Sequence, residues 1–265
     1  AVAAARRPPR RHAARGAPPL GFAMGLSQGK LQVAGFEMRS GEMVEVHYNE
    51  NAGLGFVPWP GTFALAAYLD ANAEELRLSE LNALELGSGS CSVSGLVAGH
   101  LCKHTLLTDR PEVIHPIGEA VGRARLWEKV DVKVLDWTDL EFTMSCFAQQ
   151  EIDLILMTDV VYFDFLWKPL VHTLLLLCKP TTLVLWANCD GYPKFTPDVN
   201  GFLEILEEFF DVMVEQDRRQ LGLGSPNELP TGRVLIRRLV LKDHTQAQEE
   251  VDRAMTRNCV RRCMP

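Results

Sequence analysis

The sequence predicts an α/β domain whose mostly parallel sheet is covered by helices on both faces. The chain has 265 residues, of which 47% are hydrophobic and 23% are charged, as in a globular domain of this size. Short apolar runs alternate with helical segments through most of the chain, which is the pattern of repeated strand–helix–strand units. The runs are continuously apolar, as expected for strands that are buried on both faces.

The first strands belong to a separate hairpin. Two short alternating runs, 30–36 and Met43–Tyr48, flank Ser40 and Gly41, and this arrangement predicts two antiparallel strands. The loop at 53–60 follows and ends at Pro60, which is favourable at a helix start, so a helix is expected over about 61–76.

The central pattern then predicts the sheet. We expect helices at about 92–101, after Pro111, at about 166–178 and at 201–210. The last two strands are predicted to form an antiparallel hairpin at the sheet edge. The seven predicted strands are 82–86, 105–108, 130–135, 152–157, 182–187, 211–215 and 233–241. One domain over 29–243 accounts for the pattern, with 244–265 as a tail or short helix.

The charge is unevenly distributed along the chain. The net charge is −7, but the first 36 residues hold six of the 27 basic residues and no acid, which leaves 21 basic against 34 acidic residues, or −13, beyond Phe36. An acidic body argues against nucleic acid as the main partner. No apolar run approaches the roughly 20 residues that span a bilayer, so we expect no membrane insertion.

The tail and the cysteines bear on the cellular compartment. Residues 1–28 are rich in Ala, Arg, Pro and Gly, and we expect them to be disordered. Their arginines leave organelle targeting open, although four prolines oppose an amphipathic transit helix. Seven cysteines without a CxxC pair favour a reducing compartment, so a cytoplasmic location is expected.

The segment 82–96 reads as a strand, a glycine turn and a helix start, which is where doubly wound sheets bind nucleotide-like ligands. Gly87 and Gly89 would let the backbone approach a ligand closely. The pattern lacks the third glycine of a dinucleotide site, and Glu85 would repel a pyrophosphate. A carboxylate at this position would suit a ligand that carries an amino group and hydroxyls but no phosphate, such as S-adenosylmethionine. Asp109 is placed to form hydrogen bonds with the ribose of that ligand. The alternative is that Glu85 and Asp109 are ordinary strand-end acids.

Several motifs together resemble a known family, the seven-β-strand lysine methyltransferases of methyltransferase family 16, which carry an Asp-x-x-Tyr motif. The matching stretches lie in the family's order. They are 57–60, 84–89, Thr108–Asp109, 135–137, 157–162 and 169–174. The resemblance implies a Rossmann-like class I methyltransferase that uses S-adenosylmethionine and acts on a protein substrate presenting a lysine, and we expect a monomer.

The resemblance also implies roles for particular residues. It places Trp59 over the cofactor, and Ser88 and its flanking glycines along the methionine part. It places Trp137 near the adenine and Thr158 at the end of the fourth strand. Taken singly, either tryptophan is better interpreted as core packing, which is the alternative. The family usually has glycine where this chain has Cys91, and its residues after the fifth strand are matched only loosely by Tyr192 and Lys194, which leaves cofactor affinity and acceptor choice open. The complete set of predicted cofactor residues is Trp59, Glu85, Gly87, Ser88, Gly89, Asp109, Trp137 and Thr158.

Asp159 and Tyr162 are the predicted catalytic residues. Asp159 would orient the acceptor amine and stabilise its developing charge, and Tyr162 would offer an aromatic face to the cation. A helix cap at Asp159 and packing at Tyr162 are the alternative. The acceptor could instead be a histidine or a small molecule, or the chain could be a non-catalytic relative that binds a partner.

Other chemistries find little support in the sequence. His100, Cys102 and His104 lie within five residues, but they straddle a predicted helix end, so we expect no metal site. The one G-x-S-x-G sequence, at 25–29, follows no predicted strand and so is not expected to form a nucleophile elbow, and no G-x-x-x-x-G-K-[ST] phosphate loop is present.

Overall fold

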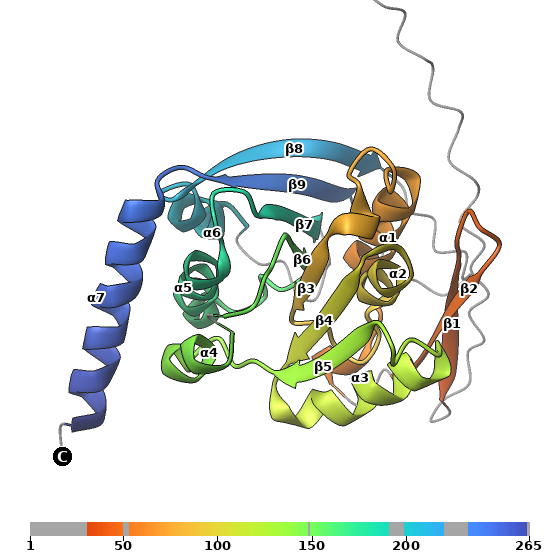
Figure 1. Cartoon of the computed structure of the whole chain (residues 1–265), viewed down its shortest axis with the longest axis horizontal. Coiled ribbons are helices and arrows are strands. Elements are labelled where there is room, and N and C mark those ends of the chain that lie inside the picture. Colours follow the sequence, from red (N-terminus) through yellow and green to blue (C-terminus); the bar gives the residue numbers. More distant parts are fainter. Residues whose placement is uncertain (1–30, 50–52, 148, 191–198, 220–232, 264–265) are drawn as a thin grey trace, which may run out of the picture.

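A computed structural model describes residues 31–49, 53–147, 149–190, 199–219 and 233–263. Its main sheet has seven strands in the order β5-β4-β3-β6-β7-β9-β8 (Figure 1). The first five strands in this order are parallel, and β9 is antiparallel to both of its neighbours. The bounds are β3 Asn82–Leu86, β4 His104–Asp109, β5 Val130–Val134, β6 Leu154–Thr158, β7 Leu183–Asp190, β8 Phe210–Arg219 and β9 Arg233–Leu241. The predicted fold class and edge hairpin are therefore confirmed.

Helices cover both faces of the sheet. One apolar core lies under α1, α2 and α3, and a second lies under α4, α5, α6 and α7 (Figure 1). Successive residues of β6 alternate between them, since Leu154 and Leu156 join the first core while Ile155 and Met157 join the second. The bounds are α1 Pro60–Ala71, α2 Val93–Leu101, α3 Pro111–Arg123, α4 Leu140–Phe147, α5 Trp167–Leu177, α6 Val199–Leu206 and α7 His244–Cys263.

The predicted N-terminal hairpin is also present. Strands β1 Gln32–Glu37 and β2 Met43–Tyr48 pair antiparallel as a separate two-stranded sheet. Phe36 and Val46 face the core while Val33 and Met43 face solvent, because side chains alternate along each strand. The pair extends the first core beyond the main sheet.

Several element boundaries differ from the prediction. The helix expected over 201–210 ends at Leu206, because Phe210 already begins β8, and α1 ends at Ala71. The helix α4 was not predicted. The segment after the sheet is the 20-residue helix α7, which buries Ala247 and Val251 and packs against α5. Residues 1–28 lie outside the described part of the chain.

Two short 3₁₀ helices contribute residues to the site. They are η1 Leu54–Phe56, before α1, and η3 Asp164–Leu166, before α5. A third 3₁₀ helix, η2 Leu78–Glu80, precedes β3. None of the helices in the described residues is long and apolar enough to cross a membrane.

Candidate functional site

A cavity of about 440 Å³ opens at the carboxyl ends of the parallel strands. The turns after β3, β4, β5 and β6 line it, together with η1, the start of α1 and the end of β7. The strand order reverses direction between β3 and β6, and this switch point is where ligands bind in open α/β sheets. Nine of the ten predicted site residues line the cavity, namely Trp59, Gly87, Ser88, Gly89, Asp109, Trp137, Thr158, Asp159 and Tyr162.

The glycine turn forms the floor of the cavity. Gly87 and Gly89 have φ values of 67° and 61°, a left-handed conformation that side chains rarely adopt. A Cβ on Gly87 would lie 2.9 Å from Val160 Cγ1 and 3.0 Å from Trp137 Cζ2, so the cavity wall packs directly onto the bare backbone. The Ser88 amide donates to the Thr108 carbonyl at 2.9 Å, which ties the turn to β4.

Asp109 occupies the end of β4. Its Oδ2 accepts a hydrogen bond from the Gly89 amide at 2.8 Å, and its Oδ1 accepts one from the Arg110 amide at 2.7 Å. Burial raises the pKa of this carboxyl, an effect that the two amide hydrogen bonds oppose. Each oxygen retains a further lone pair, so the carboxylate can also accept hydrogen bonds from ligand hydroxyls.

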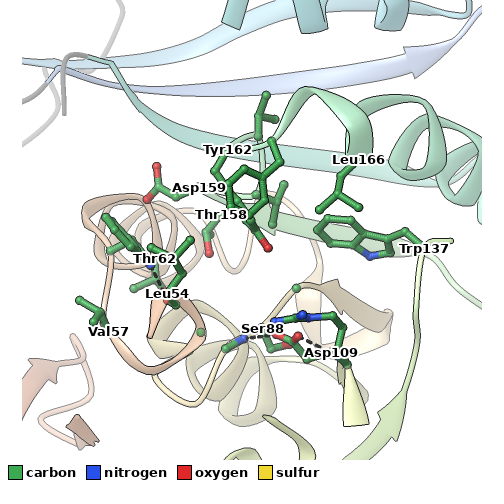
Figure 2. A pocket seen from close by; sticks show the side chains of 18 of the residues that line it. Leu54, Val57, Thr62, Ser88, Asp109, Trp137, Thr158, Asp159, Tyr162 and Leu166 are labelled. Carbon is green, nitrogen blue, oxygen red and sulfur yellow. Dashed lines mark hydrogen bonds between the residues drawn. The ribbon is translucent and has the colours of Figure 1, made fainter. Parts of the chain in front are cut away.

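Two tryptophans shape the walls. Trp137 is 9% exposed and packs beside Gly87, so it belongs to the second core and to the cavity wall at once. Figure 2 shows Leu166 above this indole. Trp59 donates from Nε1 to the Leu54 carbonyl at 3.0 Å and so fastens η1 at the cavity.

These residues fit S-adenosylmethionine. The glycine turn lines the cavity with a left-handed backbone that carries no side chains, Trp137 offers a flat apolar wall, and Asp109 offers acceptors for hydroxyls. An apolar cavity with a few convergent polar groups is typical of cofactor sites.

Glu85 is the predicted cofactor residue that does not line the cavity. It shares the face of β3 that carries Ala83, and its fully buried carboxylate accepts hydrogen bonds from Ser92 Oγ and, at 2.6 Å, from Ser94 Oγ. Burial raises its pKa to about 7. Glu85 therefore holds the N-terminus of α2, whose cap is Ser92.

Asp159 is held from two sides. Its Oδ2 accepts a hydrogen bond from the Gly61 amide at 2.6 Å, and its Oδ1 accepts one from the Cys189 amide at 2.7 Å. The backbone is left-handed, with φ at 50°, and burial raises the pKa of the carboxyl to about 6. It does not cap α5, whose N-cap is Leu166. The carboxylate instead joins α1, β6 and β7 beside the cavity.

Tyr162 lies over the cavity near Thr158, on the side that faces Ser88 and Asp109 (Figure 2). Burial raises the pKa of its hydroxyl, and the negative charge of Asp109 raises it further. The phenol is therefore protonated at neutral pH, and its ring remains available to a cation.

Cys91 lines the cavity, but its thiol is turned toward main-chain carbonyls. Sγ lies 3.5 Å from the His47 oxygen and 3.6 Å from the Phe56 oxygen. Burial raises the pKa of the thiol to about 11, so it is not a nucleophile. Tyr192 and Lys194 lie outside the described residues.

The structure adds lining residues that no motif indicated. Thr62 comes from the first turn of α1, and Asn188 and Cys189 come from the end of β7. Thr62 Oγ1 lies 2.8 Å from Ser94 Oγ and so connects α1 to the hydrogen bonds around Glu85. These lining residues reach the cavity through contacts between elements that are about 30 to 100 residues apart in the chain. A local sequence pattern does not predict such contacts.

The histidines of the excluded metal site point to different partners. His100 Nδ1 lies 3.2 Å from Glu42 Oε2, and His104 Nε2 lies 3.4 Å from Asp131 Oδ2. The described part of the chain contains no group of three or more His, Cys, Asp or Glu side chains able to hold a metal ion.

Residues 39–194 match a family described as lysine methyltransferase. The chain is 31% identical over 185 residues to a protein-lysine methyltransferase METTL21E of Bos taurus, covering 68% of this chain and 59% of that protein. It is 34% identical over 163 residues to a protein N-lysine methyltransferase METTL21A of Mus musculus, and the match covers 60% of this chain and 70% of that protein. A human sequence named as a methyltransferase-like protein 21E pseudogene is covered over 58% of its length, so the chain spans less than two thirds of some relatives.

Solved structures resemble the fold. A transferase of Pyrococcus horikoshii superposes with a TM-score of 0.50 at 13% identity, covering 79% of this chain and 72% of that one. The YcgJ protein of Bacillus subtilis superposes with a TM-score of 0.51 at 9% identity, covering 68% and 99%. At this identity the likeness shows the architecture alone.

Proposed function

Because this chain belongs to the lysine methyltransferase family, we propose that it transfers methyl groups from S-adenosylmethionine to the side-chain amine of a lysine in another protein. One observation carries the proposal. The glycine turn and Asp109, which suit the cofactor, line the same cavity as Asp159 and Tyr162, which suit the acceptor.

Positioning is the main task of the cofactor residues. The cofactor supplies a methyl group on a positively charged sulfur. Gly87 and Gly89 would present bare backbone to its amino-acid part, Asp109 would accept from its ribose hydroxyls, and Trp137 would pack against its base. In-line methyl transfer depends mostly on such alignment and on the exclusion of water.

The acceptor amine must arrive unprotonated. A lysine of ordinary pKa, about 10.4, costs about 4.6 kcal/mol to deprotonate at pH 7. Asp159 does not lower that cost, since a nearby carboxylate raises the pKa of an amine. Its pKa of about 6 leaves it ionised at neutral pH, and each oxygen has a lone pair beyond its backbone hydrogen bond. It can therefore orient an amine hydrogen and stabilise the charge that moves onto nitrogen.

Tyr162 complements this role. Its ring lies at the cavity and can contact the methylated cation, an interaction worth about 0.5–2 kcal/mol. The names of the relatives support lysine as the acceptor. Histidine or a small molecule is the alternative acceptor, and a non-catalytic partner-binding role is the alternative to an enzyme.

One experiment separates these possibilities. The protein is incubated with methyl-labelled S-adenosylmethionine and either whole or deproteinised lysate, and the labelled residue is identified by mass spectrometry. Label on a protein lysine is expected. Label on histidine, or only in the deproteinised fraction, would contradict the acceptor.

Cofactor binding tests the non-catalytic alternative. S-adenosylhomocysteine at a hundred times its dissociation constant should stabilise the fold by about 2.7 kcal/mol. Asp109→Asn should reduce the thermal shift, while Glu119→Gln, at an exposed position outside the cavity lining, should not. A wild-type protein without any shift would favour the non-catalytic role.

We also propose a monomer that works in the cytoplasm. Five described cysteines carry free thiols, as is usual in a reducing compartment. Fractionation of cells expressing a tagged protein and its elution volume on size exclusion would test both statements.

A further inference from the structure

Two consecutive aromatic contacts join three side chains that lead from the cavity to the surface. Tyr162 packs edge-on against Phe163, with ring centroids 4.9 Å apart, and Phe163 stacks on Phe165 at 5.3 Å with the planes 17° apart. All three side chains line the cavity. We refer to Tyr162, Phe163 and Phe165 as the aromatic row.

The outer end of the row is open to solvent. Phe165 is 69% exposed, the largest fraction among the large apolar side chains that the structure describes, and Phe163 is 41% exposed. Both flank Asp164 at the start of η3, which presents them at the mouth of the cavity. Exposed aromatic side chains beside a cavity are typical anchors for a binding partner, because they bury a large apolar area with little loss of side-chain entropy.

The charges around the row favour a cationic partner. Asp164 is exposed between the two phenylalanines, and Asp159 lies at the inner end. The segment 159–167 contains no Lys or Arg, although exposed Lys168 follows it directly. Arg110 also lines the cavity, but its guanidinium is paired with Glu112 at 2.9 Å. An acidic and aromatic mouth is unfavourable for anionic lipid headgroups, which attract basic segments. It suits a polypeptide that carries both a positive charge and an apolar side chain.

We infer that the aromatic row is the docking surface for the acceptor polypeptide and binds an apolar side chain within a few residues of the lysine that enters the cavity. The inference rests on the proposed function and specifies the acceptor sequence that this site prefers. An extended peptide advances about 3.3 Å per residue, so a side chain one or two positions from the lysine can reach a ring at the cavity mouth.

Two matched peptides test the preference. Both are nine residues long with a central lysine, which is flanked on each side by leucine in one peptide and by serine in the other. Their binding is measured by fluorescence anisotropy with saturating S-adenosylhomocysteine. We expect the leucine peptide to bind about tenfold more tightly, as is usual when a small apolar group enters an apolar site.

Variants connect the preference to the row. Phe165→Ala should abolish the difference between the two peptides and keep the thermal shift with S-adenosylhomocysteine, since the side chain is mostly exposed. Phe165→Trp should restore the preference. The matched control is Phe142→Ala, because Phe142 is 42% exposed on α4 and lies outside the cavity lining. This variant should behave as the wild type.

Several results would overturn the inference. They are equal affinities for the two peptides, no binding of either, or a preference that survives Phe165→Ala. Sedimentation of the protein with phosphatidylcholine vesicles, or elution as a dimer on size exclusion, would also overturn the inference if Phe165→Ala removed the vesicle binding or the dimer. The row would then bind a membrane or a second copy of the chain.

The two proposals fail separately. A leucine preference without any labelled lysine in the lysate would leave the row as a peptide site and contradict the methyl transfer. A labelled lysine without a peptide preference would contradict the role of the row alone.

Discussion

The carboxylate of Asp159 accepts a hydrogen bond of 2.6 Å from the amide of Gly61, a residue 98 positions earlier in the chain. This contact fixes the acceptor-side acid to the first turn of α1, and the Cys189 amide fixes its other oxygen to β7. Asp159 therefore stabilises the local fold besides lining the cavity.

Asp159→Asn should abolish methyl transfer and also destabilise the protein. An asparagine has one NH₂ group where the aspartate has an oxygen, so either orientation points a donor at the amide of Gly61 or Cys189. Loss of one buried hydrogen bond costs about 1–3 kcal/mol. Urea unfolding and turnover with labelled cofactor measure the two effects. A variant with near wild-type turnover would refute the catalytic role, and one with unchanged stability would refute the structural role.

Gly61→Ala should weaken the same contact from the other side. The added Cβ would collide with Asp159 Oδ2 and lie 3.1 Å from the Ala187 carbonyl, so we expect a loss of about 1–3 kcal/mol in unfolding free energy. The control is Gly118→Ala, where the nearest atom belongs to the exposed Trp127 and can move. Since alanine favours helices, this control should be neutral or slightly stabilising. Equal destabilisation of both variants would contradict the prediction.

Glu85 should make the fold less stable as the pH rises. Burial raises its pKa to about 7, so the folded state binds its proton more tightly than the unfolded chain, where glutamate has a pKa of about 4.3. The unfolding free energy then falls with rising pH across that interval. Asp159, with a pKa raised to about 6, contributes in the same direction.

Glu85→Gln tests this dependence. The serine hydroxyls around position 85 can rotate to accept from an amide, so the variant should fold and its Tm should fall less from about pH 5 to about pH 8 than that of the wild type. Glu112→Gln, at an exposed site, should follow the wild type. Parallel curves for the wild type and Glu85→Gln would show that Glu85 does not titrate in this range.

Cys91→Ala should leave cofactor binding nearly unchanged. The thiol is turned toward the carbonyls of His47 and Phe56, so its loss removes only weak contacts, and we expect the dissociation constant of S-adenosylhomocysteine to stay within about threefold. Calorimetric titration measures it. Iodoacetamide should modify exposed Cys146 well before Cys91, whose pKa is raised to about 11. Faster modification of Cys91 would contradict the buried placement.

The local sequence determined the architecture and most of the cavity. The apolar runs gave the strand positions, and parallel strands necessarily bring their carboxyl ends to one edge, so Gly87, Asp109 and Asp159 had to lie near one another. The turn glycines could be recognised because left-handed backbone demands them.

Only the tertiary structure decided which way several side chains face. Since β3 is covered on both faces, its sequence gives no amphipathic pattern, and Glu85 turned toward α2 rather than into the cavity. The docking of α7 likewise depends on a few small buried residues such as Ala247, which a helical pattern hardly reveals. The contact of Asp159 with Gly61 and the exposure of Phe165 arise from packing between distant elements, and packing of that kind is fixed by the whole core rather than by any local motif.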